Sequence, residues 1–192
     1  SGLDTATYGG AFRQFTLSGS PTGTATLAGV DGSDTLIGIE NLVFLDGNRS
    51  YDAAAHIWQS QRLYGTAFDS TADGWGLNFH SARLDAGTSL AVVATDFANS
   101  VQFQNTYGSL NNSDFVNQLY LNALNRPADP GGLSGWVGAL NAGMTRGELL
   151  VQFSESAENI NNYAGRLALG QWDIDEVTAS VARLYWGTLD RA

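Results

Sequence analysis

Acidic and amide side chains could hold a divalent cation at three places in the sequence. The candidate ligands, taken loop by loop, are Asp69 with Asp73, Asn125 with Asp129, and Asp31 with Asp34. Calcium takes about six to eight oxygen ligands, so backbone carbonyls and water would have to complete each site. The third pair forms a single degenerate turn, whereas calcium-binding nonapeptide repeats stack several turns. Calcium is therefore a possible cofactor, and helix capping is the simpler interpretation of the first two loops.

Aromatic side chains at three positions could contact a sugar ring. Trp75 lies between two glycines and out of register with the apolar stripe of its helix, which favours an exposed side chain. Trp136 falls on the apolar stripe of its own helix, which favours the core over ligand contact. Tyr107 lies in an asparagine-rich turn that offers polar contacts, although an ordinary loop has the same composition. All three remain candidate ligand-binding residues.

Charged side chains near residue 126 provide one further candidate. Arg126 precedes a proline-containing turn, where it could bind a ligand, hold helix carbonyls, or pair with Asp129 or Glu155. Glu155 and Glu158 share one helix face, as paired catalytic carboxylates would, but a structural network or a solvated face is the simpler interpretation. The sequence has no Cys or Lys, and its two histidines match no catalytic or metal-binding motif. We expect no enzymatic activity within this chain.

The composition limits the classes of partner. The 192 residues carry a formal net charge of -10, which disfavours nucleic acid and anionic membrane surfaces. Without Cys the chain cannot rely on disulfides. No apolar run is long enough for a transmembrane helix, so we expect no membrane insertion. The first residues lack the basic and apolar regions of a signal peptide.

The elements that must position these residues are arranged as a repeat with an offset of 56 residues. Leu63-Tyr64 recurs as Leu119-Tyr120, and Gly76-Leu77 recurs as Gly132-Leu133, with no gap between. A third copy begins near residue 181 and stops after one helix. We therefore expect stacked modules that belong to a longer protein.

The predicted fold class is α+β and mainly α, with a small N-terminal antiparallel β segment followed by a helical bundle. Short alternating apolar runs separated by turn residues indicate strands before residue 52, and helical periodicity follows. Each repeat should contain three helices, with a connecting helix after the second repeat. The expected divisions are 1–51 for the β segment, 52–108 and 109–170 for the two repeats, and 171–192 for the truncated third copy.

Local signals predict the ends of several helices. The expected caps are Asp73 and Asp129 at N-termini, Asp69 and Asn125 at C-termini, and Thr145 with Glu148 as a capping box. The third helix of repeat 1 should run without a break from Ser89 to Phe103.

The second repeat resembles a known domain family. Leu119 to Trp136, followed by Phe153 to Glu158, is similar to a helical family of unknown function that recurs in bacterial repeat-in-toxin and S-layer-type surface proteins. In the first repeat the resemblance is degenerate, because Ser70 stands at the position of Arg126 and His80 at that of Trp136. The resemblance implies a helical domain and specifies no activity.

A second resemblance concerns the β segment. Residues 32–47, GSDTLIGIENLVFLDG, are similar to a segment found beside calcium-binding repeats in type I-secreted proteins. This resemblance implies export in one step without a cleaved N-terminal signal. We expect an extracellular or surface location.

Together these features predict a non-catalytic module of a secreted or surface-attached bacterial protein. Its expected role is attachment to cell-surface polysaccharide, or self-association with neighbouring subunits. An alternative is an accessory region of a secreted protease or polysaccharide-degrading enzyme whose catalytic domain lies outside the chain. A structural spacer without a ligand is a third hypothesis.

Overall fold

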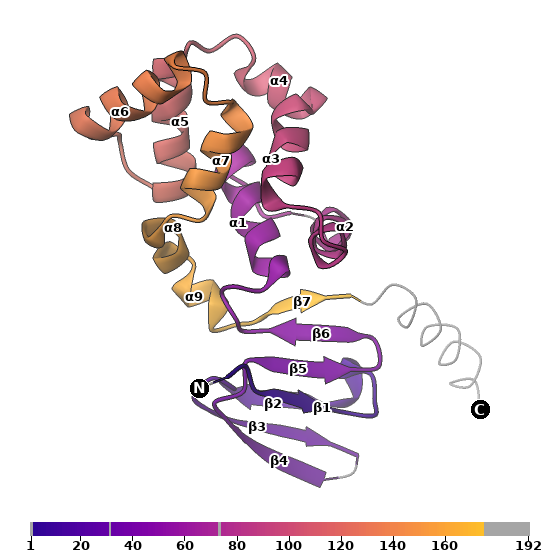
Figure 1. The fold of residues 1–192 in the computed structure, drawn as a ribbon. Helices are drawn as coiled ribbons and strands as arrows, with labels where there is room; N and C mark the ends of the chain where they lie inside the picture. Colours follow the sequence, from indigo (N-terminus) through magenta and orange to yellow (C-terminus); the bar gives the residue numbers. More distant parts are fainter. Residues whose placement is uncertain (1, 31, 73, 175–192) are drawn as a thin grey trace. The chain divides into compact units, whose positions relative to one another are not determined.

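The computed structural model describes residues 2–30, 32–72 and 74–174. Contacts divide the chain into two compact units, one that runs to Ile57 and resumes at Gly165, and one from Trp58 to Ala164. The first unit holds the strands and the second holds most of the helices (Figure 1). The predicted class, α+β and mainly α, is confirmed.

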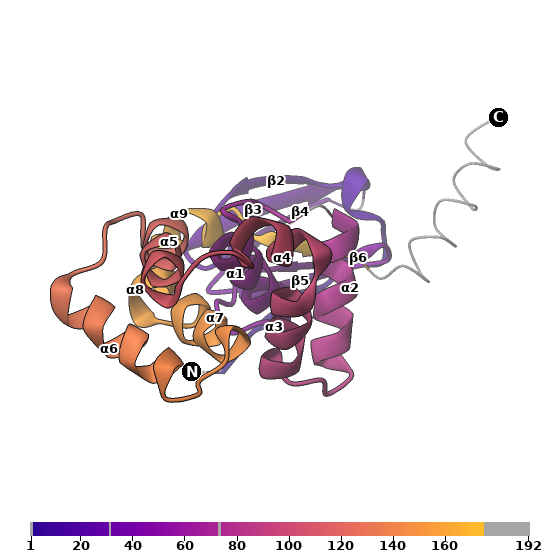
Figure 2. The same ribbon diagram turned by 90° about the horizontal axis from the view of Figure 1, so that it is seen from above.

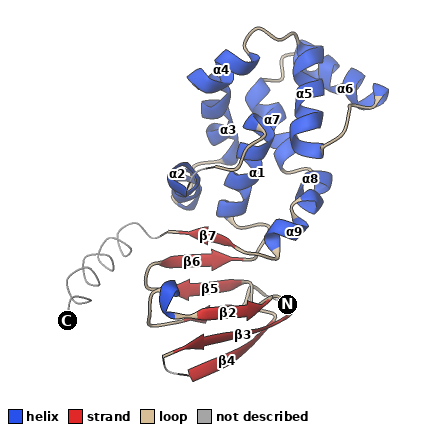
Figure 3. Ribbon diagram, turned by 180° about the vertical axis from the view of Figure 1, so that it is seen from behind, coloured by secondary structure: helices blue, strands red, loops and turns tan. Residues whose placement is uncertain are grey.

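Two small sheets form the β unit (Figure 3). One sheet contains, in spatial order, β1 (Thr5–Thr7), β5 (Asn41–Phe44), β6 (Gly47–Ser50) and β7 (Gln171–Asp173). The other contains β2 (Thr16–Gly19), β3 (Thr24–Gly29) and β4 (Gly32–Ile37) in order. The pairings are antiparallel except that β1 runs parallel to β5, with Ala6 opposite Leu42. The antiparallel pairings agree with the expected antiparallel segment, and the long connection through β2–β4 permits the one parallel pair among the described strands.

The aromatic ring of Phe44 is the centre of the β core. Phe44 is 5% exposed, and the rings of Tyr8, Phe12, Phe15 and Trp172 lie within 5.0–6.0 Å of it. Leucines from both sheets pack in the same cluster, so the two sheets share one core. The short 3-10 helix η1 (Phe12–Gln14) supplies one of these rings.

Residues from 171 onward were expected to begin a third repeat. Residues 171–173 instead form β7, in which Trp172 lies opposite Arg49 of β6. Arg49 also donates from Nε to the carbonyl of Leu169 at 3.0 Å, which holds the returning chain to the sheet. The expected helix at residues 181–192 lies outside the described residues.

The helical unit contains two copies of one arrangement (Figures 1 and 2). Repeat 1 comprises α1 (His56–Phe68), α2 (Gly74–Asp85), α3 (Leu90–Asn99) and α4 (Val101–Tyr107). Repeat 2 comprises α5 (Asn112–Leu124), α6 (Pro130–Asn141), α7 (Arg146–Ser154) and α8 (Ala157–Asn162), and α9 (Ala164–Leu167) follows. The counterparts α3 and α7 pack against each other. Among the described residues, no helix is both long and apolar enough to cross a membrane.

Repeat 1 contains four helices where three were expected, and in repeat 2 the fourth helix, α8, lies where the connecting helix was expected. The break falls at Ser100, whose backbone is extended (φ -65°, ψ 150°) and whose hydroxyl accepts from Phe103 N at 3.2 Å. Ser156 breaks repeat 2 in the same way and accepts from Asn159 N at 3.2 Å. A serine that caps the next helix ends the previous one without glycine or proline.

Several predicted caps are confirmed. Asp129 accepts a hydrogen bond from Gly132 N at 2.8 Å, and this bond lowers the pKa of the Asp129 carboxyl. Asn125 ends α5 in the left-handed conformation (φ 53°). Thr145 and Glu148 form the expected capping box at the start of α7.

A buried ion pair joins the two repeats. Arg62 of α1 is 1% exposed and donates from Nε and Nη2 to both carboxylate oxygens of Glu155, at 2.9 and 2.6 Å. Glu155 follows the last turn of α7. A second link is the hydrogen bond from Asn122 Nδ2 to the carbonyl of Thr66, its counterpart 56 residues earlier.

Replacing Glu155 by Gln removes the partner charge of Arg62 with little change in shape. We expect the free energy of unfolding to fall by about 1.5–3 kcal/mol, because the buried guanidinium loses a charged hydrogen-bond acceptor. Urea unfolding followed by tryptophan fluorescence measures the loss. Glu158→Gln is the matched control, since the same change in the exposed pair with Arg126 should cost no more than about 1 kcal/mol. Equal losses in the two variants would contradict the role of the buried pair.

Candidate ligand pocket

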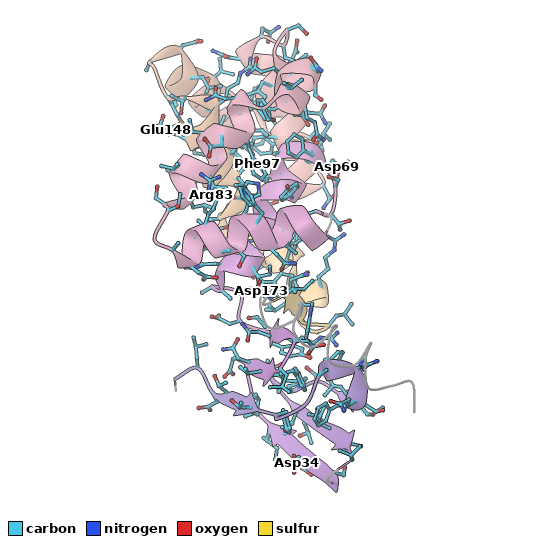
Figure 4. All side chains as sticks on the ribbon, turned by 90° about the vertical axis from the view of Figure 1, so that its right-hand side faces the viewer. Asp34, Asp69, Arg83, Phe97, Glu148 and Asp173 are labelled. Atoms are coloured by element: carbon cyan, nitrogen blue, oxygen red, sulfur yellow. The ribbon has the colours of Figure 1, made fainter. Side chains whose placement is uncertain are left out.

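A pocket of about 180 Å³ lies in repeat 1, on α1, α2, α3 and the start of α4. Its lining comprises four rings, Tyr64, Phe68, His80 and Phe97, and three polar side chains, Asp96, Ser100 and Gln102. Figure 4 labels Phe97 on α3 and Arg83 on the neighbouring α2. Pockets for drug-sized ligands measure roughly 300–1,000 Å³, so this one is suited to a single ring-sized group.

The rings of the pocket are arranged around Phe97. Tyr64 and His80 meet it edge to face, with ring centroids 4.8 and 4.7 Å away, and Phe68 lies 5.6 Å away. Phe97 is 4% exposed and belongs to the helical core, whereas the rings around it are half-buried. Edge-to-face packing fixes these rings, so the apolar wall is present before any ligand arrives.

His80 is held in its neutral form. Burial lowers its pKa below the ordinary 6.5, the nearby Arg83 guanidinium lowers it further, and Asp96 partly opposes both. Its Nδ1 atom is buried and has no hydrogen-bond partner among the described residues. A buried polar atom without a partner is uncommon and calls for an explanation.

The polar edge of the pocket carries a paired charge. Arg83 Nη2 lies 2.6 Å from Asp96 Oδ2, and the Asp96 side chain is 52% exposed. The Arg83 guanidinium also lies 5.7 Å from the ring of Phe79. Ser100 donates its hydroxyl to the carbonyl of Phe97 at 2.8 Å. The edge therefore offers a carboxylate and a guanidinium whose charges cancel.

Repeat 2 has a residue at each of the seven corresponding positions. The counterparts, 56 residues later, are Tyr120, Leu124, Trp136, Gln152, Phe153, Ser156 and Glu158. The indole of Trp136 packs on Phe153 at 5.7 Å, where His80 packs on Phe97 in repeat 1. Because indole is larger than imidazole, this difference accounts for the space in repeat 1.

Arg126 covers the counterpart in repeat 2. Its guanidinium lies 5.0 Å from the ring of Tyr120 and donates to Glu158 at 2.6 and 2.9 Å. This pairing lowers the pKa of the Glu158 carboxyl and raises that of Arg126. Repeat 1 has Ser70 and Gln102 at the two positions, so it has no equivalent ion pair over Tyr64.

The predicted ligand-binding residues lie in different environments. Trp136 and Arg126 close the site in repeat 2, as described above. The interpretation of Tyr107 as a ligand contact needs correction, because Tyr107 is 5% exposed and its hydroxyl lies 3.1 Å from Asn122 Nδ2 in the core. The side chain of Trp75 lies outside what the structure describes.

The candidate metal ligands do not come together in the described part of the chain, which holds no cluster of three or more Asp, Glu or His side chains suited to a metal ion. Asp69 is exposed at the end of α1 with φ 50°, as its counterpart Asn125 is in repeat 2. Asp34 lies on β4 (Figure 4), and Asp129 is engaged as a cap. Asp31 and Asp73 lie outside the described residues.

Sequence reasoning did not identify the pocket. Ser70 and His80 were recognised only as differences between the first repeat and the second, with no link to Phe97 or Asp96. The available signal was the size of the side chain at position 80 compared with position 136. Several helices together form the pocket. The exchange of one side chain, His80 for Trp136, therefore did not reveal its position in the sequence.

Comparison with known proteins identifies one domain. Residues 94–163 match the family described as Domain of unknown function (DUF4214), so the expected helical domain of unknown function is present there. The match covers the end of α3 through α8 and therefore spans repeat 2. No curated protein and no solved structure matches the chain significantly.

Filling the pocket should stabilise the helical unit. We expect His80→Trp, combined with Phe68→Leu to copy the packing of repeat 2, to raise the free energy of unfolding by about 0.5–2 kcal/mol. The converse change, Trp136→His, should lower it by about 3 kcal/mol, because it leaves a cavity around Phe153. Thermal unfolding of the three proteins measures both effects. A loss of stability in the first variant would show that repeat 1 has no room for an indole.

The pH dependence of stability should reflect the protonation of the His80 imidazole. Its folded-state pKa is lowered, so the stability associated with the neutral ring is complete above pH 6.5 and is lost as the pH falls below that value. We expect the melting temperature of the parent protein to fall further than that of His80→Trp between about pH 7.5 and pH 5.5. Parallel curves for the two proteins would argue against a neutral, buried imidazole.

Proposed function

We propose that this chain is a non-catalytic attachment module of a secreted or surface-attached bacterial protein, and that the pocket of repeat 1 binds cell-surface polysaccharide. The observation that carries the proposal is an open ring-lined pocket beside paired Asp96 and Arg83. Rings present an apolar surface to the face of a sugar, and the neighbouring carboxylate and guanidinium can exchange hydrogen bonds with its hydroxyls.

Two further features support binding over catalysis. Two polar groups of the pocket already have partners, since Asp96 pairs with Arg83 and the Ser100 hydroxyl donates to the carbonyl of Phe97. The ring centroids of Tyr64, Phe79 and Phe97 lie 4.7–5.8 Å from that of His80. A general base needs a nucleophile within hydrogen-bond reach, and the described neighbours of His80 supply none. The resemblances in sequence to surface and type I-secreted proteins support the location.

Binding to whole cells tests the proposal. The full chain should sediment with Gram-negative cells that carry surface polysaccharide and with purified lipopolysaccharide. His80→Trp should reduce the bound fraction at least about tenfold, because the indole occupies the space that the ligand needs. Gln152→Ala changes the counterpart of Asp96 in repeat 2 and should bind as the parent does. Undiminished binding by a folded His80→Trp protein would exclude the pocket as the attachment site.

A further inference from the structure

We infer that the pocket of repeat 1 takes a single, uncharged sugar ring from the end of a glycan chain. This inference rests on the proposed function and specifies its ligand. The open volume of about 180 Å³ has room for one ring and not for an oligosaccharide. A ring within a polymer has neighbours on both sides and needs a groove, whereas a terminal ring can enter a pocket.

Repeat 2 offers a comparison, because an indole stands there at the position of His80. The indole of Trp136 packs on Phe153, and the two positions correspond to the pocket and to Phe97 in repeat 1. A ligand ring that enters the pocket therefore meets the half-buried rings of Tyr64, Phe68 and His80, and Phe97 forms the buried floor beneath them. Aromatic rings present an apolar wall, against which the apolar face of a sugar can pack.

The electrostatics of the lining select an uncharged ligand. Repeat 2 has a cation at Arg126 with its counter-ion Glu158, and both positions are neutral in repeat 1. The remaining charges at the edge, Asp96 and Arg83, are paired at 2.6 Å and cancel. An anionic sugar also faces the net charge of -10 of the chain. Hydroxyl groups, which both donate and accept, can bond to the carboxylate and the guanidinium at once.

Titration of the full chain with methyl glycosides tests the inference. The probes are neutral methyl hexopyranosides, methyl glucuronide as the anionic sugar, methyl glucosaminide as the cationic sugar, and the matching neutral trisaccharides, followed by amide chemical shifts. We expect at least one neutral methyl glycoside to bind with shifts at Phe97 and His80. Its trisaccharide should bind with a Kd within about threefold, because only the terminal ring is held.

Two variants complete the test. Asp96→Asn should weaken the binding of the neutral glycoside about tenfold, as expected for loss of a hydrogen bond to a charged group, and Gln152→Ala should leave it unchanged. Binding of only the charged sugars, or affinity that rises about tenfold with each added ring, would overturn the inference. If His80→Trp abolishes attachment to cells but no methyl glycoside binds, the attachment function stands and the single-ring ligand is wrong.

Discussion

The helical unit depends on the buried pair between Arg62 and Glu155. A guanidinium that is 1% exposed is tolerated in a protein interior only when a carboxylate and further hydrogen bonds compensate its charge. Because Arg62 lies in α1 and Glu155 follows α7, their two-point contact links repeat 1 to repeat 2. The pair therefore fixes the register in which α3 and α7 pack, and with it the position of Phe97, which lies on α3.

The two repeats have corresponding helices and helix ends, but they carry different side chains. Ser100 and Ser156 break corresponding helices with nearly identical angles, and Asp69 and Asn125 both end helices in the left-handed region. Among the side chains that differ, His80, Asp96 and Gln102 lie together in repeat 1, at the pocket. Repeat 2 fills this place with an indole and an ion pair, whereas repeat 1 leaves an open space beside His80. The duplication thus allows the pocket of repeat 1 to be compared with the corresponding positions of repeat 2 in the same molecule.

Features set by short-range interactions were predictable from the sequence. The caps at Asp129 and Thr145 depend on residues three positions away, and the repeat depends only on matching letters. The break at Ser100 was missed because the apolar stripe continues across it and neither glycine nor proline marks it. The parallel pairing of β1 with β5 and the pairing of β7 with β6 join residues far apart in the sequence, where no local pattern reports the partner. The pocket was missed for a similar reason, because its rings come from three different helices.

The open site of repeat 1 carries a cost that repeat 2 avoids. The volume beside Phe97 forgoes dispersion contacts, and the buried Nδ1 of His80 lacks a partner among the described residues. A chain optimised only for packing would place an indole at both positions, as it does at Trp136. A ligand that binds the native state alone restores stability in proportion to its occupancy, so the missing contacts are supplied when the pocket is filled. In the proposed role, repeat 2 keeps the helical unit folded while the pocket of repeat 1 is empty.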